Sequence, residues 1–319
     1  MVNHKRILIA VDGSSHSLDA VNYVAFQCRG LKTRVNLLYV FPMASDELIC
    51  QINMDGELKR SIQEKYYEFN RQCERMAQDS IDQAKDILIE LGMAPEYVSG
   101  VPRMWQLGIA RDILKEARKG YDAVVVGRRG ISRIEAFLMG SVSAKVVQGS
   151  HKTPVWVVGK KPASDAGSPR MLLAVDASEN SRKAVEYSAD FAAGNGAEVT
   201  LCHVVRRLMA GPATPAMEMA GEEIEKELQE TMKEKIQVMF DTYRNILETA
   251  GVAPDKIATV CRTGSYSRAA EILDIARTGD FDTVVLGRRG ISAVREFFMG
   301  RVTSKVLNGA DDLSVWIVP

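Results

Sequence analysis

Two short stretches of this chain have the residue types of a phosphate-binding site. Residues 127–130 read Gly-Arg-Arg-Gly, and after nine further residues the stretch 140–143 reads Gly-Ser-Val-Ser at the expected start of a helix. Glycine lets the backbone approach a ligand closely, and a helix start offers unpaired N–H groups to an anion. The hydroxyls of Ser141 and Ser143 add donors. Arg128 and Arg129 add positive charge, although we expect arginines beside a turn to be exposed and solvated.

A carboxylate near the N-terminus is the second candidate group. Asp12 follows the apolar run 7–11 in the sequence AVDGSS, and Asp176 follows a similar run in AVDAS. At a strand end, such a carboxylate can accept hydrogen bonds from a ribose or an amine. The alternative is an Asp that caps the following helix, which is the commoner role for an isolated Asp in a strand-to-helix turn.

Other catalytic signatures are absent from the sequence. It contains no G-x-x-x-x-G-K-[ST] loop, no G-x-G-x-x-G after the first strand and no H-E-x-x-H. The four histidines are scattered, and the five cysteines lie far apart without a Cys-x-x-Cys pair, so we expect them to be reduced packing residues. We predict no catalytic residue and no set of metal ligands.

The chain is an internal duplication. Residues 121–140 align without gaps on residues 281–300, with 12 of 20 positions identical, so that the three glycines recur with the same spacing. Two ordinary turns would not explain that recurrence. The Gly-, Pro- and Ser-containing stretch between the copies predicts a first domain at residues 1–159, a linker at 160–169 and a second domain at 170–319.

Each copy alternates short apolar runs with longer amphipathic stretches. In the first copy the expected strands are residues 7–11, 35–40, 97–101, 123–127 and 155–158. The expected helices are residues 17–28, 62–91, 107–118 and 142–148. The second copy repeats this order, and its long helix at 222–250 carries an apolar, methionine-rich face that we interpret as core packing. Strands that are apolar on both faces and separated by helices indicate a parallel α/β sheet covered on both sides.

Composition narrows the class of protein further. The 319 residues include 41 Lys and Arg against 41 Asp and Glu, so the net charge is zero and no global positive field favours nucleic acid. Hydrophobic residues make up 46%, which is typical of a soluble globular protein. The apolar run at residues 7–11 is too short for a signal peptide or a membrane span. We therefore expect a cytoplasmic protein with neither nucleic acid nor membrane as partner.

The glycine stretch resembles the G-2x-G-9x-G-(S/T) signature of the ATP-binding universal stress proteins, and the match covers both halves of the chain. This resemblance implies two tandem copies of a Rossmann-like, adenine nucleotide alpha hydrolase-like sandwich with strand order 3-2-1-4-5. It implies ATP, or else AMP or ADP, as ligand, and Mg²⁺ could accompany the nucleotide through its phosphate oxygens. Dimerisation through the last strands would pair residues 155–158 with 315–318 as an intramolecular pseudo-dimer, with a further homodimer left open.

The resemblance also implies the residues of the two sites. In the first domain they are Ala10, Val11, Asp12, Val40, Gly127, Arg129, Gly130, Gly140, Ser141, Val142 and Ser143. In the second domain they are Asp176, Val204, Gly287, Gly290, Gly300, Arg301, Val302 and Thr303. The second copy departs from the pattern, because Arg301 replaces Ser141 and Ala177 replaces Gly13. Arg301 could bind a phosphate or fill its pocket, and we predict that the first site binds ATP more reliably than the second.

A phosphate cradle without a catalytic constellation predicts a nucleotide-dependent regulator of the stress response rather than an enzyme. One alternative is a slow ATPase or a self-phosphorylating protein that uses Ser141 or Ser143. Another is a second domain that serves only as a structural duplicate and binds no nucleotide.

Overall fold

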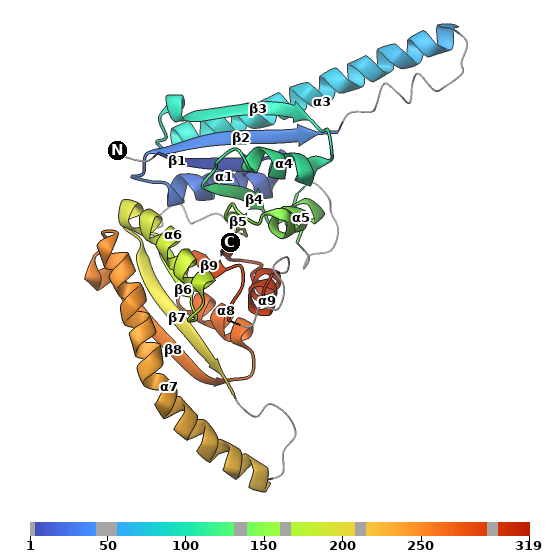
Figure 1. Ribbon diagram of the computed structural model, residues 1–319. Helices are drawn as coiled ribbons and strands as arrows, with labels where there is room; N and C mark the ends of the chain where they lie inside the picture. Colours follow the sequence, from blue (N-terminus) through green and yellow to red (C-terminus); the bar gives the residue numbers. More distant parts are fainter. Residues whose placement is uncertain (1–3, 43–55, 131–138, 160–166, 208–214, 292–298) are drawn as a thin grey trace. The chain divides into compact units, whose positions relative to one another are not determined.

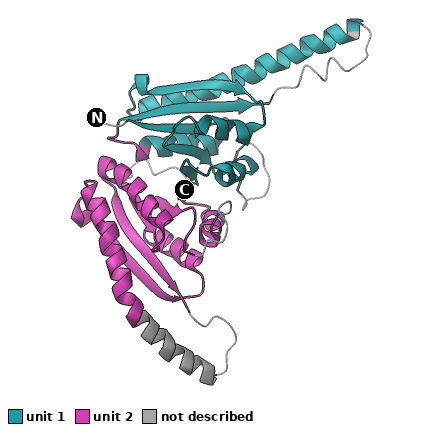
Figure 2. Ribbon diagram, viewed as in Figure 1, with its two compact units in different colours: residues 1–25, 32–161 teal, residues 26–31, 162–319 magenta. Residues whose placement is uncertain are grey.

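The computed structural model describes residues 4–42, 56–130, 139–159, 167–207, 215–291 and 299–319, without the side chains of Leu58 and of residues 215–229. It divides into two compact units, coloured separately in Figure 2. Unit 1 comprises Met1–Ala25 and Lys32–Lys161, and unit 2 comprises Phe26–Leu31 and Pro162–Pro319. The exact domain boundaries stay a prediction, and most of the expected linker lies outside the described residues.

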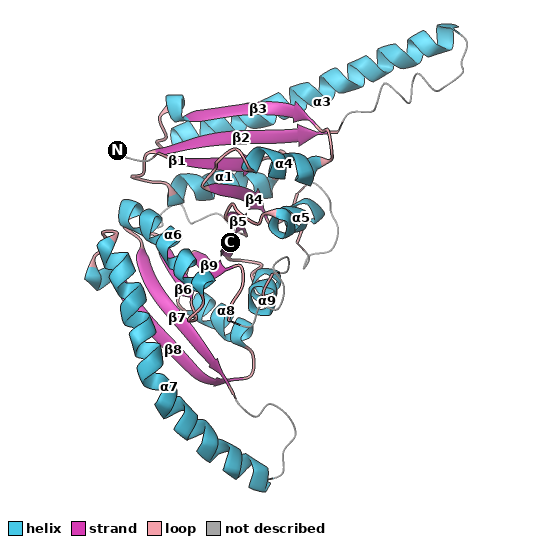
Figure 3. Ribbon diagram, in the orientation of Figure 1, coloured by secondary structure: helices cyan, strands magenta, loops and turns pink. Residues whose placement is uncertain are grey.

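In its described residues, unit 1 alternates strands and helices along the chain (Figures 1 and 3). The strands are β1 (Lys5–Ala10), β2 (Thr33–Phe41), β3 (Val98–Met104), β4 (Ala123–Gly127) and β5 (Val155–Val158). The helices are α1 (Ser15–Gln27), α3 (Gly56–Glu90), the short 3-10 helix η1 (Pro95–Tyr97), α4 (Ile109–Ala117) and α5 (Ser141–Gly149). The strands pair in parallel in the order β3-β2-β1-β4-β5, which confirms the predicted 3-2-1-4-5 order.

Unit 2 repeats this order of elements in its described residues. The strands are β6 (Arg170–Ala174), β7 (Glu198–Arg206), β8 (Ile257–Ser265), β9 (Thr283–Gly287) and β10 (Ser314–Val318). The helices are α6 (Glu179–Asn195), α7 (Pro215–Thr249), η2 (Pro254–Lys256), α8 (Arg268–Thr278) and α9 (Arg301–Gly309). The parallel order β8-β7-β6-β9-β10 is the same 3-2-1-4-5 arrangement, so the α/β fold class is confirmed for both copies.

Helices cover each side of the sheet in both units, and they bury most of its strands. Every residue of β4, β5, β9 and β10 is buried. In unit 2, α6 packs against α7 and α8 packs against α9, and right-handed crossovers place these two pairs on opposite faces. The edge strand β3 instead alternates between half-buried and exposed residues, with Pro102 tolerated there because an edge strand can do without one N–H.

The two long helices exceed their predicted lengths. Both α3 and α7 span 35 residues, whereas the apolar pattern predicted helices at 62–91 and 222–250. The turns added to α3, residues 56–61, are mostly polar, so apolar periodicity did not reveal them. Those added to α7 begin at Pro215, a residue suited to the first helical position. On the methionine-rich face, Tyr243 and Leu247 are buried and Met239 is half-buried, which confirms core packing for that end of α7. None of the described helices is long and apolar enough to cross a membrane.

Candidate functional site

The two candidate stretches of each unit meet at one edge of its sheet. Strand β1 lies between β2 and β4, so the strand order reverses beside it, and the carboxyl ends of parallel strands at such a point form the usual ligand crevice. Asp12 follows β1 through the buried Val11, and Gly127 is the last residue of the neighbouring strand β4. In unit 2, Asp176 follows β6 and Gly287 ends β9 in the same way.

The Asp12 side chain stabilises its own turn and does not cap α1. Its Oδ1 accepts hydrogen bonds from Ser14 N at 3.1 Å and from Ser14 Oγ at 2.6 Å. Ser14 Oγ in turn accepts from Ser17 N at 3.2 Å, so Ser14 caps the helix. Gly13 lies between them with φ +75°, a conformation that favours glycine. The capping alternative for Asp12 is therefore wrong, and its carboxylate is held at the strand end.

At positions 127 and 130 an added Cβ atom would lie too close to a neighbouring atom, which favours glycine at both. A Cβ atom built on Gly130 would lie 2.4 Å from Asp12 Oδ2, and one on Gly127 would lie 2.7 Å from the carbonyl oxygen of His16. Gly140 differs, because the nearest protein atom to its Cβ would be Arg129 Cα at an ordinary 3.4 Å. Gly140 N donates to the carbonyl of Arg128 at 2.9 Å, which folds the start of α5 back against residues 127–130.

The two predicted serines have different roles. Ser143 is 6% exposed, and its Oγ donates to the carbonyl of Gly127 at 2.7 Å, so this hydroxyl fastens α5 to β4. The expectation that it donates into the site is wrong, because a hydroxyl has one proton to give. Ser141 is exposed at the first position of α5, followed by the half-buried Val142. The N-cap Gly140 has no side chain to satisfy the N–H groups of this helix start.

The paired arginines also differ from expectation. Arg128 is 2% exposed and Arg288 is 3% exposed, so the first arginine of each pair is buried rather than solvated. Arg128 N donates to the carbonyl of Val158 at 2.8 Å, which extends the β4–β5 ladder by one residue. Burial and then the neighbouring Arg289 lower the pKa of Arg288. Arg129 and Arg289, the second arginine of each pair, are half-buried.

A backbone carbonyl of β2 faces the same crevice. Leu38 O accepts the last ladder bond from Val11 N at 3.0 Å, just beyond Ala10, the last residue of β1. Carbonyls alternate sides along a strand, so Val40 O, two residues on, points the same way, over the end of β1. Tyr39 precedes it, and burial followed by the charge of Asp12 raises the pKa of this phenol.

The second unit repeats the carboxylate-glycine pair. Asp176 Oδ1 accepts from Ser178 N at 3.1 Å and from Ser181 Oγ at 2.7 Å, and Asp176 Oδ2 accepts from Ile291 N at 3.2 Å. A Cβ atom on Gly290 would lie 2.5 Å from Asp176 Oδ2, almost as in unit 1. Ser178 caps α6 by accepting from Ser181 N. The site geometry is therefore duplicated together with the fold.

The helix start of unit 2 keeps one feature of unit 1 and changes another. The buried Thr303 donates from Oγ1 to the carbonyl of Gly287 at 2.9 Å, as Ser143 does in unit 1. Arg301 is exposed at the first position of α9 after Gly300, and Val302 is half-buried. The duplication thus retains the inward hydroxyl and replaces the outward one by a guanidinium.

Two residues beside the unit 2 site were not predicted from the sequence. Tyr243 of α7 donates from its hydroxyl to the carbonyl of Asp176 at 2.7 Å, and burial followed by Asp176 raises its pKa to about 12. Arg268 of α8 donates from Nε to the carbonyl of Val204 at 3.1 Å. A phenol on an otherwise aliphatic helix face was the available signal for Tyr243. For Arg268 the signal was an arginine where the first copy has Ile109.

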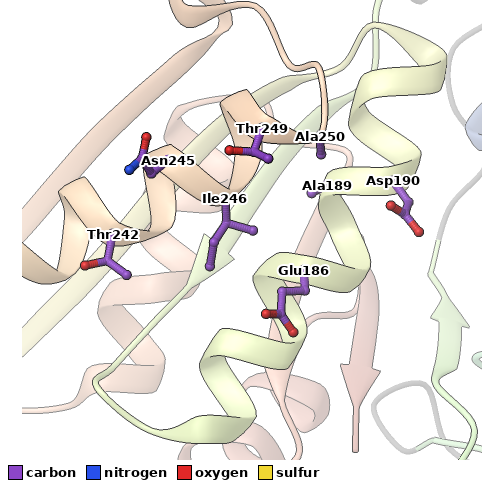
Figure 4. Close-up of a pocket in the computed structure, with 8 residues that line it drawn as sticks. All are labelled: Glu186, Ala189, Asp190, Thr242, Asn245, Ile246, Thr249 and Ala250. Carbon is purple, nitrogen blue, oxygen red and sulfur yellow. The ribbon is translucent and has the colours of Figure 1, made fainter.

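A shallow groove between α6 and α7 lies apart from these residues (Figure 4). It has a volume of about 580 Å³, and its lining comprises Glu186, Ala189, Asp190, Thr242, Asn245, Ile246, Thr249 and Ala250. None of these belongs to the predicted site. In the part of the chain that the structure describes, no group of three or more His, Cys, Asp or Glu side chains is arranged to hold a metal ion.

Comparison with known proteins identifies the family. The family model described as "Universal stress protein family" matches residues 3–159 and again residues 168–319. Universal stress protein YxiE of Bacillus subtilis is 29% identical over 157 residues, which are 48% of this chain and 97% of that protein. Universal stress protein Rv1996 of Mycobacterium tuberculosis is 24% identical over 312 residues, which are 95% of this chain and 91% of that protein.

A solved structure gives the same result for the fold. The crystal structure of a universal stress protein from Archaeoglobus fulgidus superposes with a TM-score of 0.56 at 18% identity, covering 98% of this chain and 97% of that one. The family match in each half agrees with the duplicated sheet and with the duplicated carboxylate-glycine pair. The chain belongs to the universal stress protein family, as a tandem of two such domains.

Proposed function

We propose that the protein binds ATP in unit 1 and acts as a nucleotide-dependent regulator of the stress response. The observation that carries this proposal is the meeting of Asp12, Gly130 and the start of α5 at the switch point of the sheet, where Gly130 lacks the Cβ that Asp12 would exclude. A carboxylate, a glycine turn and a helix N-terminus at one edge match a sugar followed by phosphates.

In this proposal a protein group binds each part of the nucleotide: the ribose, the phosphates and the adenine. The carboxylate of Asp12 accepts hydrogen bonds from ribose hydroxyls, and the first-turn N–H groups of α5 hold the phosphates. The carbonyl of Val40, over the end of β1, accepts a hydrogen bond from the adenine amine. Mg²⁺ accompanies the nucleotide through its phosphate oxygens, since Mg²⁺ often keeps several waters and few protein ligands. AMP and ADP would use the same groups with fewer phosphate contacts.

Calorimetric titration of ATP into the full-length protein tests the proposal directly. We expect one tight site per chain in unit 1 and weaker or no ATP binding in unit 2, where Arg301 replaces the exposed serine. The same titration with Arg301→Ser tests whether that guanidinium causes the asymmetry. Two equal sites in both proteins would contradict the asymmetry, and the absence of any ATP binding would contradict the proposed function. Nucleotide that co-purifies can be counted per chain as an independent measurement.

The alternative is an enzyme, either a slow ATPase or a protein that phosphorylates itself. The buried, inward-bonded hydroxyl of Ser143 disfavours it as a phosphate acceptor, whereas the exposed Ser141 stays available. Mass spectrometry after incubation with Mg-ATP distinguishes the two functions, because self-phosphorylation requires a phosphoserine that Ser141→Ala abolishes. Hydrolysis at about 1–10³ s⁻¹, typical of enzymes, and lost in Asp12→Ala would refute the regulatory proposal.

We also propose the assembly and location that the family resemblance implies. The last strands of the two domains, residues 155–158 and 315–318, would pair as an intramolecular pseudo-dimer in a cytoplasmic protein. Sedimentation analysis would show whether the chain forms a further homodimer. A second unit that binds no nucleotide in any variant would indicate a structural duplicate.

A further inference from the structure

The two units differ beside the ends of β2 and β7, where the base of the nucleotide is proposed to bind. Helix α4 begins at Ile109 and helix α8 begins at Arg268. These residues are counterparts, because Leu114 and Leu273, each five residues further on, contact Gly149 and Gly309 in the same way. A side chain that cannot form hydrogen bonds in unit 1 therefore corresponds to a cationic donor in unit 2.

Arg268 reaches the carbonyl that corresponds to Val40 O. Cys202 O accepts the last ladder bond from β6, from Val175 N at 2.8 Å. Val204 O, two residues on, points to the same side, over the strand end where Asp176 follows. There it accepts from Arg268 Nε at 3.1 Å, while Arg268 as a whole is exposed, so its other N–H groups lie beside this carbonyl at the open edge.

The loops that precede these helices reinforce the difference. In unit 1 the buried Asp112 of α4 fixes the loop after β3, because its carboxylate accepts hydrogen bonds from Gln106 N at 2.6 Å and from Leu107 N at 3.2 Å. Leu107 itself is 61% exposed. In unit 2 the corresponding residue is Tyr266, and its hydroxyl accepts from Arg207 Nη1 at 2.7 Å. At these two positions unit 1 has the apolar Leu107 and Ile109, whereas unit 2 has Tyr266, which binds Arg207, and Arg268.

We propose that Arg268 is a specificity-determining residue that reverses the hydrogen-bonding character of the base end in unit 2. This inference rests on the proposed nucleotide site. In unit 1 the free acceptor is a carbonyl, which suits the 6-amino group of adenine. In unit 2 a guanidinium, which has donors only, covers that carbonyl, so it opposes the amino group and suits a base that presents an oxygen there. The second unit therefore selects a 6-oxopurine nucleotide over ATP.

ATP and ITP test this inference, because their bases differ at the 6-position and the adjacent N1 proton. Both nucleotides are titrated into a chain whose first site is weakened by Gly130→Ala. The titrations are done once with the native Arg301 and once with Arg301→Ser. We expect ITP to bind unit 2 about tenfold more tightly than ATP, the effect of one mismatched hydrogen bond. Arg268→Ile, which installs the residue of unit 1, is expected to abolish this preference. Arg244→Ala removes an equal charge from α7, where the guanidinium lies 4.0 Å from Glu248, and should leave the preference unchanged.

Three results would overturn the inference. They are ATP binding at least as tight as ITP binding, an unchanged ratio in Arg268→Ile, and binding of neither nucleotide to unit 2 even with Arg301→Ser. The reciprocal variant Ile109→Arg in the wild-type chain should weaken ATP binding to unit 1 relative to ITP. Failure of the proposed function is seen separately, because the wild-type chain would then bind no ATP at unit 1. Circular dichroism checks that each variant is folded.

Discussion

Replacing Gly130 by alanine is the sharpest perturbation of the proposed site. The added Cβ would lie 2.4 Å from Asp12 Oδ2, whereas an ordinary contact begins near 3.4 Å, so the carboxylate or the turn must withdraw by the difference of about 1 Å. A shift of that size disrupts the bonds from Ser14 N at 3.1 Å and Ser14 Oγ at 2.6 Å. Losing one hydrogen bond to a charged group costs about 1.5–3 kcal/mol. ATP should therefore bind unit 1 roughly ten- to a hundredfold more weakly.

Isothermal titration calorimetry measures this loss, and two glycines supply matched controls. Gly290→Ala makes the same clash in unit 2, at 2.5 Å from Asp176 Oδ2, and should leave the tight site of unit 1 intact. Gly56→Ala meets no atom within 4 Å and should change nothing. If Gly130→Ala binds ATP with wild-type affinity, or if Gly290→Ala weakens the tight site equally, then the Asp12–Gly130 contact does not shape the binding site.

Three further predictions concern stability and reactivity. Glu116 is held by Arg103 at 2.6 Å and Lys119 at 2.8 Å. Burial opposes its ionisation, but the hydrogen bonds from Lys119 and Arg103 outweigh it and lower the pKa of Glu116. This contribution to stability is fully present above the ordinary pKa of glutamate, and it is lost as the pH falls through the lowered pKa of Glu116. Urea denaturation should therefore show that Glu116→Gln loses roughly 2 kcal/mol of unfolding free energy at neutral pH and less in acid. Tyr243→Phe removes the hydrogen bond to the Asp176 carbonyl and should lower the free energy of unfolding by about 1 kcal/mol. An unchanged free energy of unfolding would contradict this stabilising role. Burial raises the pKa of Cys202 to about 12, so a thiol reagent at pH 8 should label the exposed Cys261 well before Cys202, as read by peptide mass spectrometry.

The repeated alternation of apolar runs and amphipathic stretches was sufficient to predict a duplicated parallel α/β fold, whereas the strand order was predicted from the resemblance to the universal stress proteins. Strand β4 and strand β5 begin and end where the apolar runs do, because a strand buried on both faces is apolar throughout. The helix at Gly56 begins six residues earlier than predicted, since exposed turns carry no apolar periodicity. Hydrogen-bond direction was the main source of error within the site. A sequence does not show that the Ser143 hydroxyl points to Gly127, or that Ser14 rather than Asp12 caps the helix.

The glycine motif could not predict every residue of the candidate site. Arg268 is distant in sequence from Val204, and only the placement of α8 beside the end of β7 brings them together. Buried arginines such as Arg128 also differ from what composition predicts, because arginine side chains are mostly exposed. These contacts depend on tertiary packing, which the local pattern of a single sequence does not predict.

The inward hydroxyl of Ser143, repeated by Thr303, has a kinetic consequence. It fixes the first turn of the helix to the end of the neighbouring strand, so the proposed phosphate donors of that turn would be held in place before a nucleotide binds. A site arranged in advance spends little binding free energy on ordering the chain. Association should then proceed in a single phase at a rate set by encounter, and variants in the cradle should change mainly the lifetime of the complex. Under the proposed function, such a site would respond promptly to changes in the nucleotide concentration.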